Sequence, residues 1–232
     1  EEHCLALHAD GAGTKSIVAY LAFRETGDPS IFAGLAQDAL IMNIDDLLCI
    51  GATGPFVVTN TIGRHRKLIP SEAIEAVIGG YQRCAEVLSG QGVQVTLCGG
   101  ETADLGDLVR TLVVDAAVAC RMPKAKVLDG SAVRSGDVIV GLSSCGRATY
   151  EEKENSGIGS NGLTLARHLL LSPKYREQFP EALDPELDTE RAYRGPFQLG
   201  QTPEGWSMTV ADALSSPTRT YAPIIARASG AP

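Results

Sequence analysis

The sequence places a carboxylate, two glycines and an ammonium group within six residues near its start, as D-G-A-G-T-K at residues 10–15. This is not a P-loop, because that motif requires a glycine, four residues and then Gly-Lys-Ser/Thr, whereas Lys15 follows a threonine. The combination suits a metal–phosphate site, in which an aspartate holds Mg²⁺ while backbone amides and a lysine meet phosphate oxygens. The alternative is a tight turn between two strands, with Asp10 as a turn residue.

Polar side chains interrupt an otherwise apolar helical pattern at Asn43, Asp45 and Asp46. Mg²⁺ usually takes only one or two protein carboxylates and completes its shell with water and substrate phosphates. One of the two adjacent aspartates is therefore a candidate metal ligand. A solvated helix face would explain the same residues without any ligand.

A second acidic segment, G-G-E-T-A-D at residues 99–104, follows an apolar strand pattern. Two glycines would let the backbone approach a ligand closely. Glu101, Thr102, Asp104 and Asp107 then crowd acids and a hydroxyl onto one expected loop, and such a cluster repels itself unless a cation is present. The alternative is an acidic surface loop.

A glycine-rich segment at residues 157–162 is expected to open a helix. Free amides at a helix N-terminus bind anions, so Ser160, Asn161 and Gly162 are candidates for phosphate contacts; an ordinary helix cap is the alternative. A basic run at residues 64–67 is typical of a solvated loop. No partner spacing indicates a role for three of the histidines: His3, His8 and His168.

Strands and helices in the first half must position these segments. Alternating and β-branched patterns predict strands at residues 4–8, 16–22, 56–62, 93–97 and 108–120. Apolar stripes at helical spacing predict helices at residues 35–50 and 71–90, the second with Ser71 as its N-cap. The order lacks the regular rhythm of a doubly wound sheet, so the predicted fold class is α+β.

A polar stretch at residues 122–136 marks an expected domain boundary. Beyond it we expect a strand at 138–142, a helix at 160–171, and a proline-rich surface insertion at 172–205 with one helical piece. Two regular elements cannot bury both of their apolar faces, so this second part is expected to need partners from beyond Pro232.

Composition excludes several classes of protein. The chain has 232 residues, of which 44% are hydrophobic and 21% charged, and these are globular values rather than those of disordered, collagen-like or coiled-coil chains. No run reaches the roughly 18 apolar residues of a membrane helix. The formal net charge of −8 argues against duplex nucleic acid as a partner, since its affinity comes from many Lys and Arg contacts to phosphate.

The six cysteines lie mostly in apolar runs and lack C-x-x-C spacing, so buried, reduced thiols are expected rather than a zinc site. No signal peptide is visible, although the chain begins at Glu1 without a methionine. A reducing, cytoplasmic location is therefore expected.

The joint order of the motifs is more specific than any one of them. The chain resembles the phosphoribosylformylglycinamidine cyclo-ligases, also called aminoimidazole ribonucleotide synthetases, through D-G-A-G-T-K at 10–15, I-D-D-L-L-C-I-G-A at 44–52, G-G-E-T-A-D at 99–104, G-S-N-G at 159–162 and S-P-T-R-T-Y at 216–221. The resemblance covers nearly the whole chain.

The resemblance implies two α+β domains. Residues 1–122 would form an N-terminal ATP-binding and dimerisation domain that contributes strands to a β-barrel shared across a homodimer. Residues 123–232 would be the beginning of a C-terminal domain, which is incomplete. The implied enzyme is an ATP- and Mg²⁺-dependent ligase of de novo purine biosynthesis, which closes the ring of formylglycinamidine ribonucleotide to give aminoimidazole ribonucleotide.

The resemblance also implies roles for individual residues. The acidic metal ligands would be Asp10, Asp46 and Glu101. The catalytic residues would be Asp46, Glu101 and Asn161. The residues lining the nucleotide and its phosphates would be Gly11, Gly13, Thr14, Lys15, Gly99, Gly100, Thr102, Ser160 and Gly162.

The chain departs from the family at two positions. Relatives often have Asn-Asp where this chain has Asp45 and Asp46, and often have a histidine where it has Gly159. Two other functions remain open at this point. One is that of another ATP-using member of the superfamily, such as a small-molecule kinase or a selenophosphate synthetase-like enzyme. The other is a catalytically idle nucleotide-binding module.

Overall fold

The computed structural model describes residues 2–230 and contains one four-stranded sheet, in the order β1-β4-β2-β3. The strands are β1 (His3–Gly11), β2 (Phe56–Arg64), β3 (Val95–Asp104) and β4 (Leu112–Pro123). Strand β4 pairs antiparallel with both β1 and β2, whereas β2 and β3 are parallel. The mixed arrangement confirms the α+β fold class.

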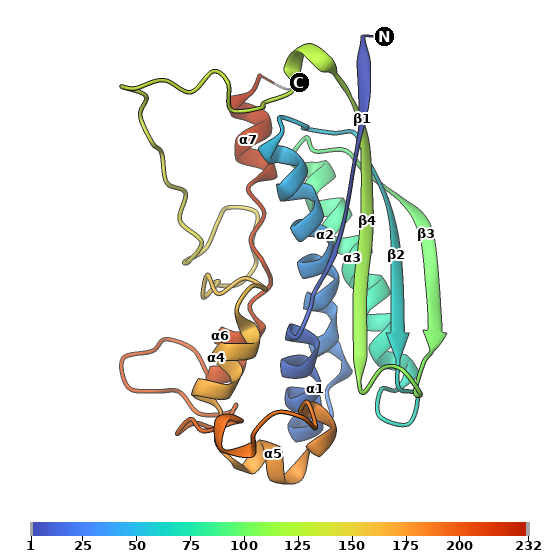
Figure 1. Ribbon diagram of the computed structural model, residues 1–232, viewed down its shortest axis with the longest axis vertical. Helices are drawn as coiled ribbons and strands as arrows, with labels where there is room; N and C mark the ends of the chain where they lie inside the picture. Colours follow the sequence, from blue (N-terminus) through green and yellow to red (C-terminus); the bar gives the residue numbers. More distant parts are fainter. Residues whose placement is uncertain (1, 231–232) are drawn as a thin grey trace.

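Three helices cover one face of this sheet: α1 (Lys15–Thr26), α2 (Ala33–Cys49) and α3 (Ser71–Gly90) (Figure 1). The two long helices that the apolar stripes predicted are confirmed. Ser71 is the first residue of α3 and Pro70 occupies the cap position, so the predicted serine cap is displaced by one residue. Within residues 2–230, no helix lies on the opposite face of the sheet (Figure 1).

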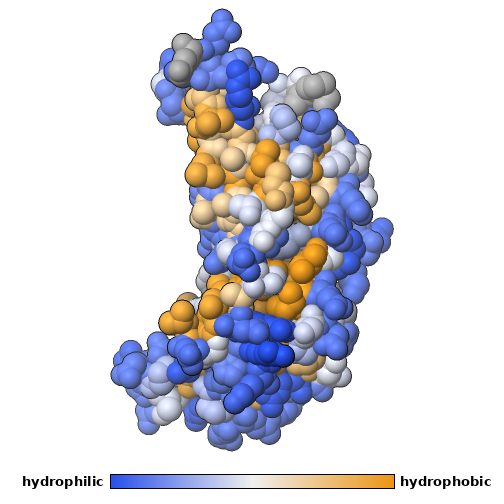
Figure 2. Space-filling view, turned by 90° about the vertical axis from the view of Figure 1, so that its right-hand side faces the viewer, coloured by the Kyte–Doolittle hydropathy of each residue, from blue (hydrophilic) through white to orange (hydrophobic). Residues whose placement is uncertain are grey.

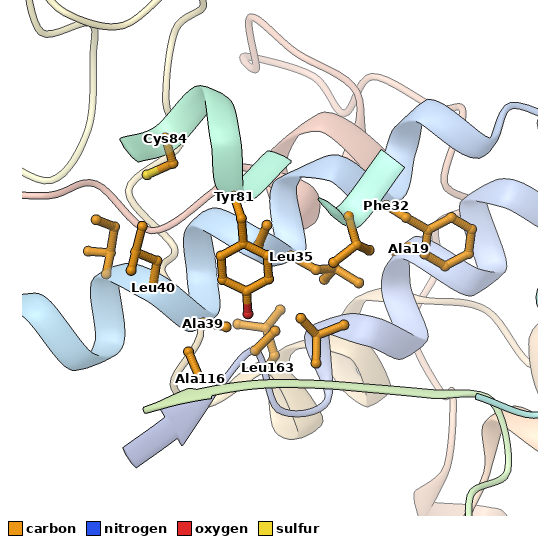
Figure 3. Packing of buried hydrophobic residues seen from close by; sticks show 14 of the residues in the cluster. Ala19, Phe32, Leu35, Ala39, Leu40, Tyr81, Cys84, Ala116 and Leu163 are labelled. Carbon is orange, nitrogen blue, oxygen red and sulfur yellow. The ribbon is translucent and has the colours of Figure 1, made fainter. Parts of the chain in front are cut away.

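The main core lies between the sheet and these helices. Figure 3 shows the Tyr81 ring of α3 among apolar side chains of α2, with its hydroxyl directed toward β4. That hydroxyl donates to the carbonyl of Asp115 at 3.2 Å, which satisfies the one polar group of a fully buried ring. Leu163, from the second half of the chain, joins the same cluster.

The second half lies on the side of α1 and α2 that faces away from the sheet (Figure 1). It contains α4 (Leu163–Leu170), α5 (Lys174–Gln178), α6 (Val210–Ser215) and α7 (Ala222–Ala228). The expected helix at 160–171 is confirmed in shorter form, and 172–205 is irregular with one α-helix, as expected. Short 3₁₀ turns occur at Pro29–Phe32, Lys124–Lys126, Pro180–Ala182 and Thr189–Arg191.

The strand predicted at 16–22 is wrong, because these residues belong to helix α1. Five successive residues, 18–22, are buried. Strand β4 and helix α2 pack against one side of the helix, and α4 and α6, from the second half of the chain, pack against the other. A helix buried all round has no apolar stripe, so periodicity could not separate it from a buried strand.

The expected loop after residue 97 is also wrong, because β3 continues through both glycines to Asp104. The pairing with β2 shifts register between Val58 and Asn60, which leaves an extra residue on β3 beside Gly99. Gly99 has φ +95°, a value that residues with a side chain rarely adopt. The glycines therefore form a β-bulge, which lets the strand continue where a loop was expected.

Two further expectations are corrected. Residues 138–142 form no strand and project into solvent, with Ile139 97% exposed, because no strand among residues 2–230 lies beside them. All six cysteines are free thiols, but the expectation of burial is wrong for three of them: Cys49, Cys98 and Cys145. None of the helices in the described part of the chain is long and apolar enough to cross a membrane.

His168 supplies a test of the packing of the second half. It is buried against Tyr193 and Arg167, and burial together with the positive Arg167 lowers its pKa to about 4. An unfolded histidine titrates near pH 6.5, so the unfolded chain binds the proton more tightly and the folded state loses stability as the pH falls from about 6.5 to 4.

We expect His168→Asn, which cannot titrate, to remove this loss, worth about 2–3 kcal/mol. Urea unfolding of both proteins at pH 7 and pH 4.5 measures it. The stability deficit of the variant should shrink at the lower pH, whereas an equal deficit at both values would contradict the burial of a neutral imidazole.

Candidate functional site

The D-G-A-G-T-K segment forms a turn from the end of β1 into helix α1. The amide of Ala12 donates to the carbonyl of Val114 at 2.9 Å, and Gly13 has φ +56°. The hydroxyls of Thr14 and Thr164 are 2.8 Å apart, although the residues are 150 positions apart in sequence. The turn therefore lies beside the N-terminus of α4, where the G-S-N-G segment ends.

Lys15 points into the protein from this turn. Its ammonium donates to Asp38 Oδ1 at 2.8 Å and to the carbonyl of Ser216, and both side chains of the ion pair are 1% exposed. Burial lowers the pKa of Lys15, while the charge of Asp38 opposes that shift. The predicted phosphate-binding lysine thus has its ammonium engaged inside the fold.

Sequence reasoning missed Asp38. A signal existed, since this aspartate falls among Ala36, Ala39 and Leu40, all of which belong to the buried stripe of α2. An acid on a buried helix face requires a partner, but spacing alone did not say that Lys15 would be that partner.

Asp46 lies on α2 with its carboxylate 3.0 Å from His8 Nε2, on strand β1. The other ring nitrogen, Nδ1, is 3.0 Å from Asn43 Oδ1. The Asn43 amide nitrogen donates to three carbonyls, of Asp10, Ala39 and Ala116, which fixes the oxygen as the atom that faces the imidazole. His8, for which spacing indicated no role, is thus the direct neighbour of a predicted metal ligand.

The adjacent Asp45 has a different environment. It is partly buried and accepts hydrogen bonds from the hydroxyl of Thr220 at 3.0 Å and the amide of Tyr221 at 3.1 Å. Burial raises its pKa to about 7, and the charge of Asp46 contributes in the same direction. Asp45 therefore anchors the S-P-T-R-T-Y segment, and Asp46 is the more accessible carboxylate of the pair.

Arg219 anchors the same segment from its other side. Its guanidinium donates to Glu151 Oε1 at 2.8 Å and to the carbonyls of Ser143, Cys145 and Gly146. The predicted family motif near the end of the chain is therefore held by polar contacts at Arg219 and Thr220, and the Thr218 amide adds a hydrogen bond to Asp38 at 2.7 Å.

The open face of the sheet has a cavity of about 460 Å³ at the end of β1, lined by Asp10, Gly11, Thr59, Asn60, Thr61 and Asp115 with adjoining alanines. Partial burial and the nearby charge of Asp10 raise the pKa of Asp115. The two carboxylates repel one another, and a cation between them would relieve that repulsion. Asp115, the one acid in the β4 pattern, was also missed.

Glu101 lies on the same row of the sheet, since Gly11, Asp115, Thr61 and Glu101 are successive cross-strand neighbours. Gly11 and Glu101, at the two ends of this row, are separated by three strand spacings, which is about 14 Å. Among residues 2–230, no group of three or more His, Cys, Asp or Glu side chains is arranged to hold a metal ion. One chain thus does not gather Asp10, Asp46 and Glu101 around a single ion.

The other predicted residues fall into two places. Gly13, Thr14, Asn161 and Gly162 are exposed around the turn and the start of α4, and Ser160 donates to Asp38 at 2.8 Å. Gly99, Gly100 and Thr102 lie on the edge strand β3. A side chain at Gly100 would lie 2.4 Å from the Asn60 carbonyl, so the close approach seen there is to the neighbouring strand.

Comparison with known proteins assigns the fold to a family. The family model described as AIR synthase related protein, N-terminal domain, matches residues 1–122, more than half of the chain. The chain belongs to this family.

Several curated relatives of this AIR synthase related chain are named phosphoribosylformylglycinamidine cyclo-ligase. It is 34% identical over 172 residues to the phosphoribosylformylglycinamidine cyclo-ligase of Pyrococcus furiosus, covering 74% of this chain and 43% of that protein. It is 30% identical over 220 residues to the protein of the same name from Methanocaldococcus jannaschii, and the match covers 95% of this chain and 49% of that protein. The chain thus spans about half the length of the curated relatives it matches.

Among solved structures, phosphoribosylformylglycinamidine synthase II from Thermotoga maritima superimposes with a TM-score of 0.37 at 17% identity. The superposition covers 57% of this chain and 19% of that one.

The turn of this AIR synthase related chain can be tested at Gly11. A β-carbon there would lie 1.8 Å from Asp115 Oδ1 and 2.7 Å from the carbonyl of Val114. We expect Gly11→Ala to lower the free energy of unfolding by about 1–3 kcal/mol, because the backbone carbonyl cannot move aside as a flexible side chain can.

Gly90→Ala is the matched control. A methyl group at that position would have no atom within 4 Å, apart from its chain neighbours and the backbone of its own helix. It should leave stability unchanged or raise it by up to about 1 kcal/mol. Equal melting temperatures for the two variants would contradict the packing of β1 against β4 at this point.

Proposed function

We propose that this chain is the ATP-binding part of a phosphoribosylformylglycinamidine cyclo-ligase. The observation that carries the proposal is the family match over residues 1–122, the part that holds D-G-A-G-T-K, the Asp45 and Asp46 pair and G-G-E-T-A-D. The curated relatives with the cyclo-ligase name extend the similarity into the second half of the chain.

The proposed reaction converts formylglycinamidine ribonucleotide and ATP to aminoimidazole ribonucleotide, ADP and phosphate. An amide carbonyl oxygen is a poor leaving group. Transfer of the γ-phosphoryl group to that oxygen turns it into phosphate, which leaves when the neighbouring nitrogen attacks the carbon and closes the ring. The protein contributes mainly by positioning the reactants and stabilising the transferred charge.

The turn and the start of α4 suit the phosphate chain of ATP. Gly13 and Gly162 both have positive φ and are exposed, so backbone amides are accessible there without side-chain crowding. Thr14 and Thr164 hold the two segments together, and Asn161 is exposed beside them. These are the residues that we propose to contact phosphate oxygens.

Asp10 and Asp115 fit a magnesium ion. Partial burial and the charge of Asp10 both raise the pKa of Asp115, and Mg²⁺ commonly takes one or two carboxylates with water and phosphate oxygens. When bound, the ion would neutralise phosphate charge that bare carboxylates would repel. Asp46, on α2 beside His8, and Glu101, at the far end of the row, remain proposed metal and catalytic residues, although one chain does not bring them to the Asp10 and Asp115 pair.

We propose that the protein is a homodimer through the open face of its sheet. Leu5 and Leu7 of β1 are 80% and 73% exposed, and Val57 of β2 is 49% exposed. Figure 2 shows apolar residues gathered over this side of the molecule. Face-to-face packing of two such sheets would bury these side chains between the subunits.

Ring closure is tested directly by incubating the natural protein with formylglycinamidine ribonucleotide, Mg²⁺ and ATP, and measuring aminoimidazole ribonucleotide and phosphate. Asp46→Asn and Glu101→Gln should each lower kcat on the order of 10²-fold, because each removes charge from the phosphate cleft. Asp107→Asn, an exposed acid of the neighbouring turn, is the matched control and should not change the rate.

Failure of the wild-type protein to form product would reject the cyclo-ligase function. Phosphate transfer to thiamine monophosphate or selenide instead would favour another enzyme of the superfamily. Nucleotide binding without any turnover would favour an idle binding module. Wild-type rates in both variants would reject the roles given to Asp46 and Glu101.

Dimerisation is tested by Leu7→Lys. A lysine on the apolar face should convert a dimer to a monomer at micromolar concentration in light scattering, since a stable interface buries more than about 1,000 Å² and tolerates few unpaired charges at its centre. Ile78→Lys, on the outer surface of α3, is the control and should leave the mass unchanged. A monomeric wild-type protein would count against the proposal.

A further inference from the structure

Asp38 is a buried carboxylate whose contacts come from three separate parts of the chain. It has no exposed surface. Its Oδ1 atom lies 2.8 Å from Lys15 Nζ, 2.8 Å from Ser160 Oγ, and 2.7 Å from both the amide and the hydroxyl of Thr218. Ser160 and Thr218 are 122 and 180 positions from Asp38 in the sequence.

All of these contacts are on one oxygen. The other oxygen, Oδ2, is buried without a hydrogen-bond partner. A buried carboxylate is costly unless its charge is balanced and its oxygens accept hydrogen bonds. The Lys15 ammonium balances the charge, so the pair is neutral as a unit, and the hydroxyls of Ser160 and Thr218 share the oxygen that the ammonium binds.

The surrounding contacts hold the same two segments. The Gln37 side-chain amide donates to the Thr218 carbonyl at 2.9 Å, and the Asn155 side-chain amide donates to the Pro217 carbonyl at 2.8 Å. The Ser160 and Thr218 hydroxyls are themselves 3.1 Å apart. The segments 157–162 and 216–218 therefore meet each other at the carboxylate and are attached to α2 through it.

We infer that Asp38 is a positioning residue, which fixes the 157–162 segment against the D-G-A-G-T-K turn so that the two sides of the phosphate cleft keep their spacing. This inference rests on the proposed function for the role of the cleft, but the fixing of the segment is a property of the fold alone. Because Asp38 is buried, it acts only through Lys15, Ser160 and Thr218.

We expect Asp38→Asn to loosen only the segments that contact the carboxylate. The asparagine keeps the volume and one acceptor oxygen but leaves the Lys15 ammonium without a counter-charge. Hydrogen exchange should become at least about tenfold faster in 157–162 and 216–218, because local opening sets the exchange rate there, while α3 and β2 keep wild-type protection. The KM for ATP should rise about tenfold, with kcat at saturating ATP changed much less.

Two further variants keep the test decisive if Asp38→Asn does not fold. Ser160→Ala leaves the Lys15–Asp38 pair intact and should loosen 157–162 alone. Asp45→Asn is the matched control, since it alters another hydrogen-bonded carboxylate of α2, which is partly buried and binds Thr220 and Tyr221. It should loosen 220–222 and leave 157–162 protected.

Unchanged protection of 157–162 in both Asp38→Asn and Ser160→Ala would overturn the inference, as would a uniform increase across the whole protein. A fall in kcat at saturating ATP with an unchanged KM would also overturn it. Binding of ATP with MgCl₂ to the wild-type protein is measured separately. Its absence would reject the proposed function, and the exchange pattern would then still decide whether Asp38 positions the segment.

Discussion

Strand β4 is hydrogen-bonded on both sides, to β1 and to β2, and its alternate residues from Leu112 to Met122 are buried under the helices. This one-sided burial constrains the remainder of the molecule. Because side chains alternate along a strand, residues on the other face of β4 cannot share the core, and Asp115 is among them. Because of this alternation, Asp115 and Glu101 lie on the face that the helices leave bare, whereas Asp46 lies on α2 beside His8, on the covered side.

The same constraint explains how much of the fold could be predicted from the sequence. Helix α3 and strand β2 are predictable because each has one buried and one more exposed face, and that asymmetry is what periodicity detects. Helix α1 is buried on nearly all sides, so its pattern indicates a strand instead. The bulge in β3 depends on pairing with β2, which no local pattern encodes, and residues 138–142 show that an apolar run does not make a strand without a neighbour.

The candidate site also contains residues that could be predicted from the sequence and residues that could not. Motif residues such as Asp10, Asp46 and Ser160 could be selected from the sequence, because acids and glycines beside apolar runs are conspicuous. Their partners could not be selected, since the roles of Asp38, His8 and Asp115 depend on contacts between residues that are far apart in the sequence. Asp38 and Lys15 illustrate the reason: a buried ion pair adds little net stability over apolar residues, but loss of one partner costs about 3–5 kcal/mol. Such a pair specifies one arrangement of the chain more strongly than it stabilises it.

The bulge at Gly99 has a consequence for self-association. Strand β3 is an edge strand, and a flat edge with free amides and carbonyls is a template on which other chains can add strands and aggregate. An extra residue in the middle of that edge bends and twists it, so a regular incoming strand would lose its register halfway along. The edge is thereby protected from open-ended growth, which leaves the apolar face as the surface proposed for a closed, finite assembly.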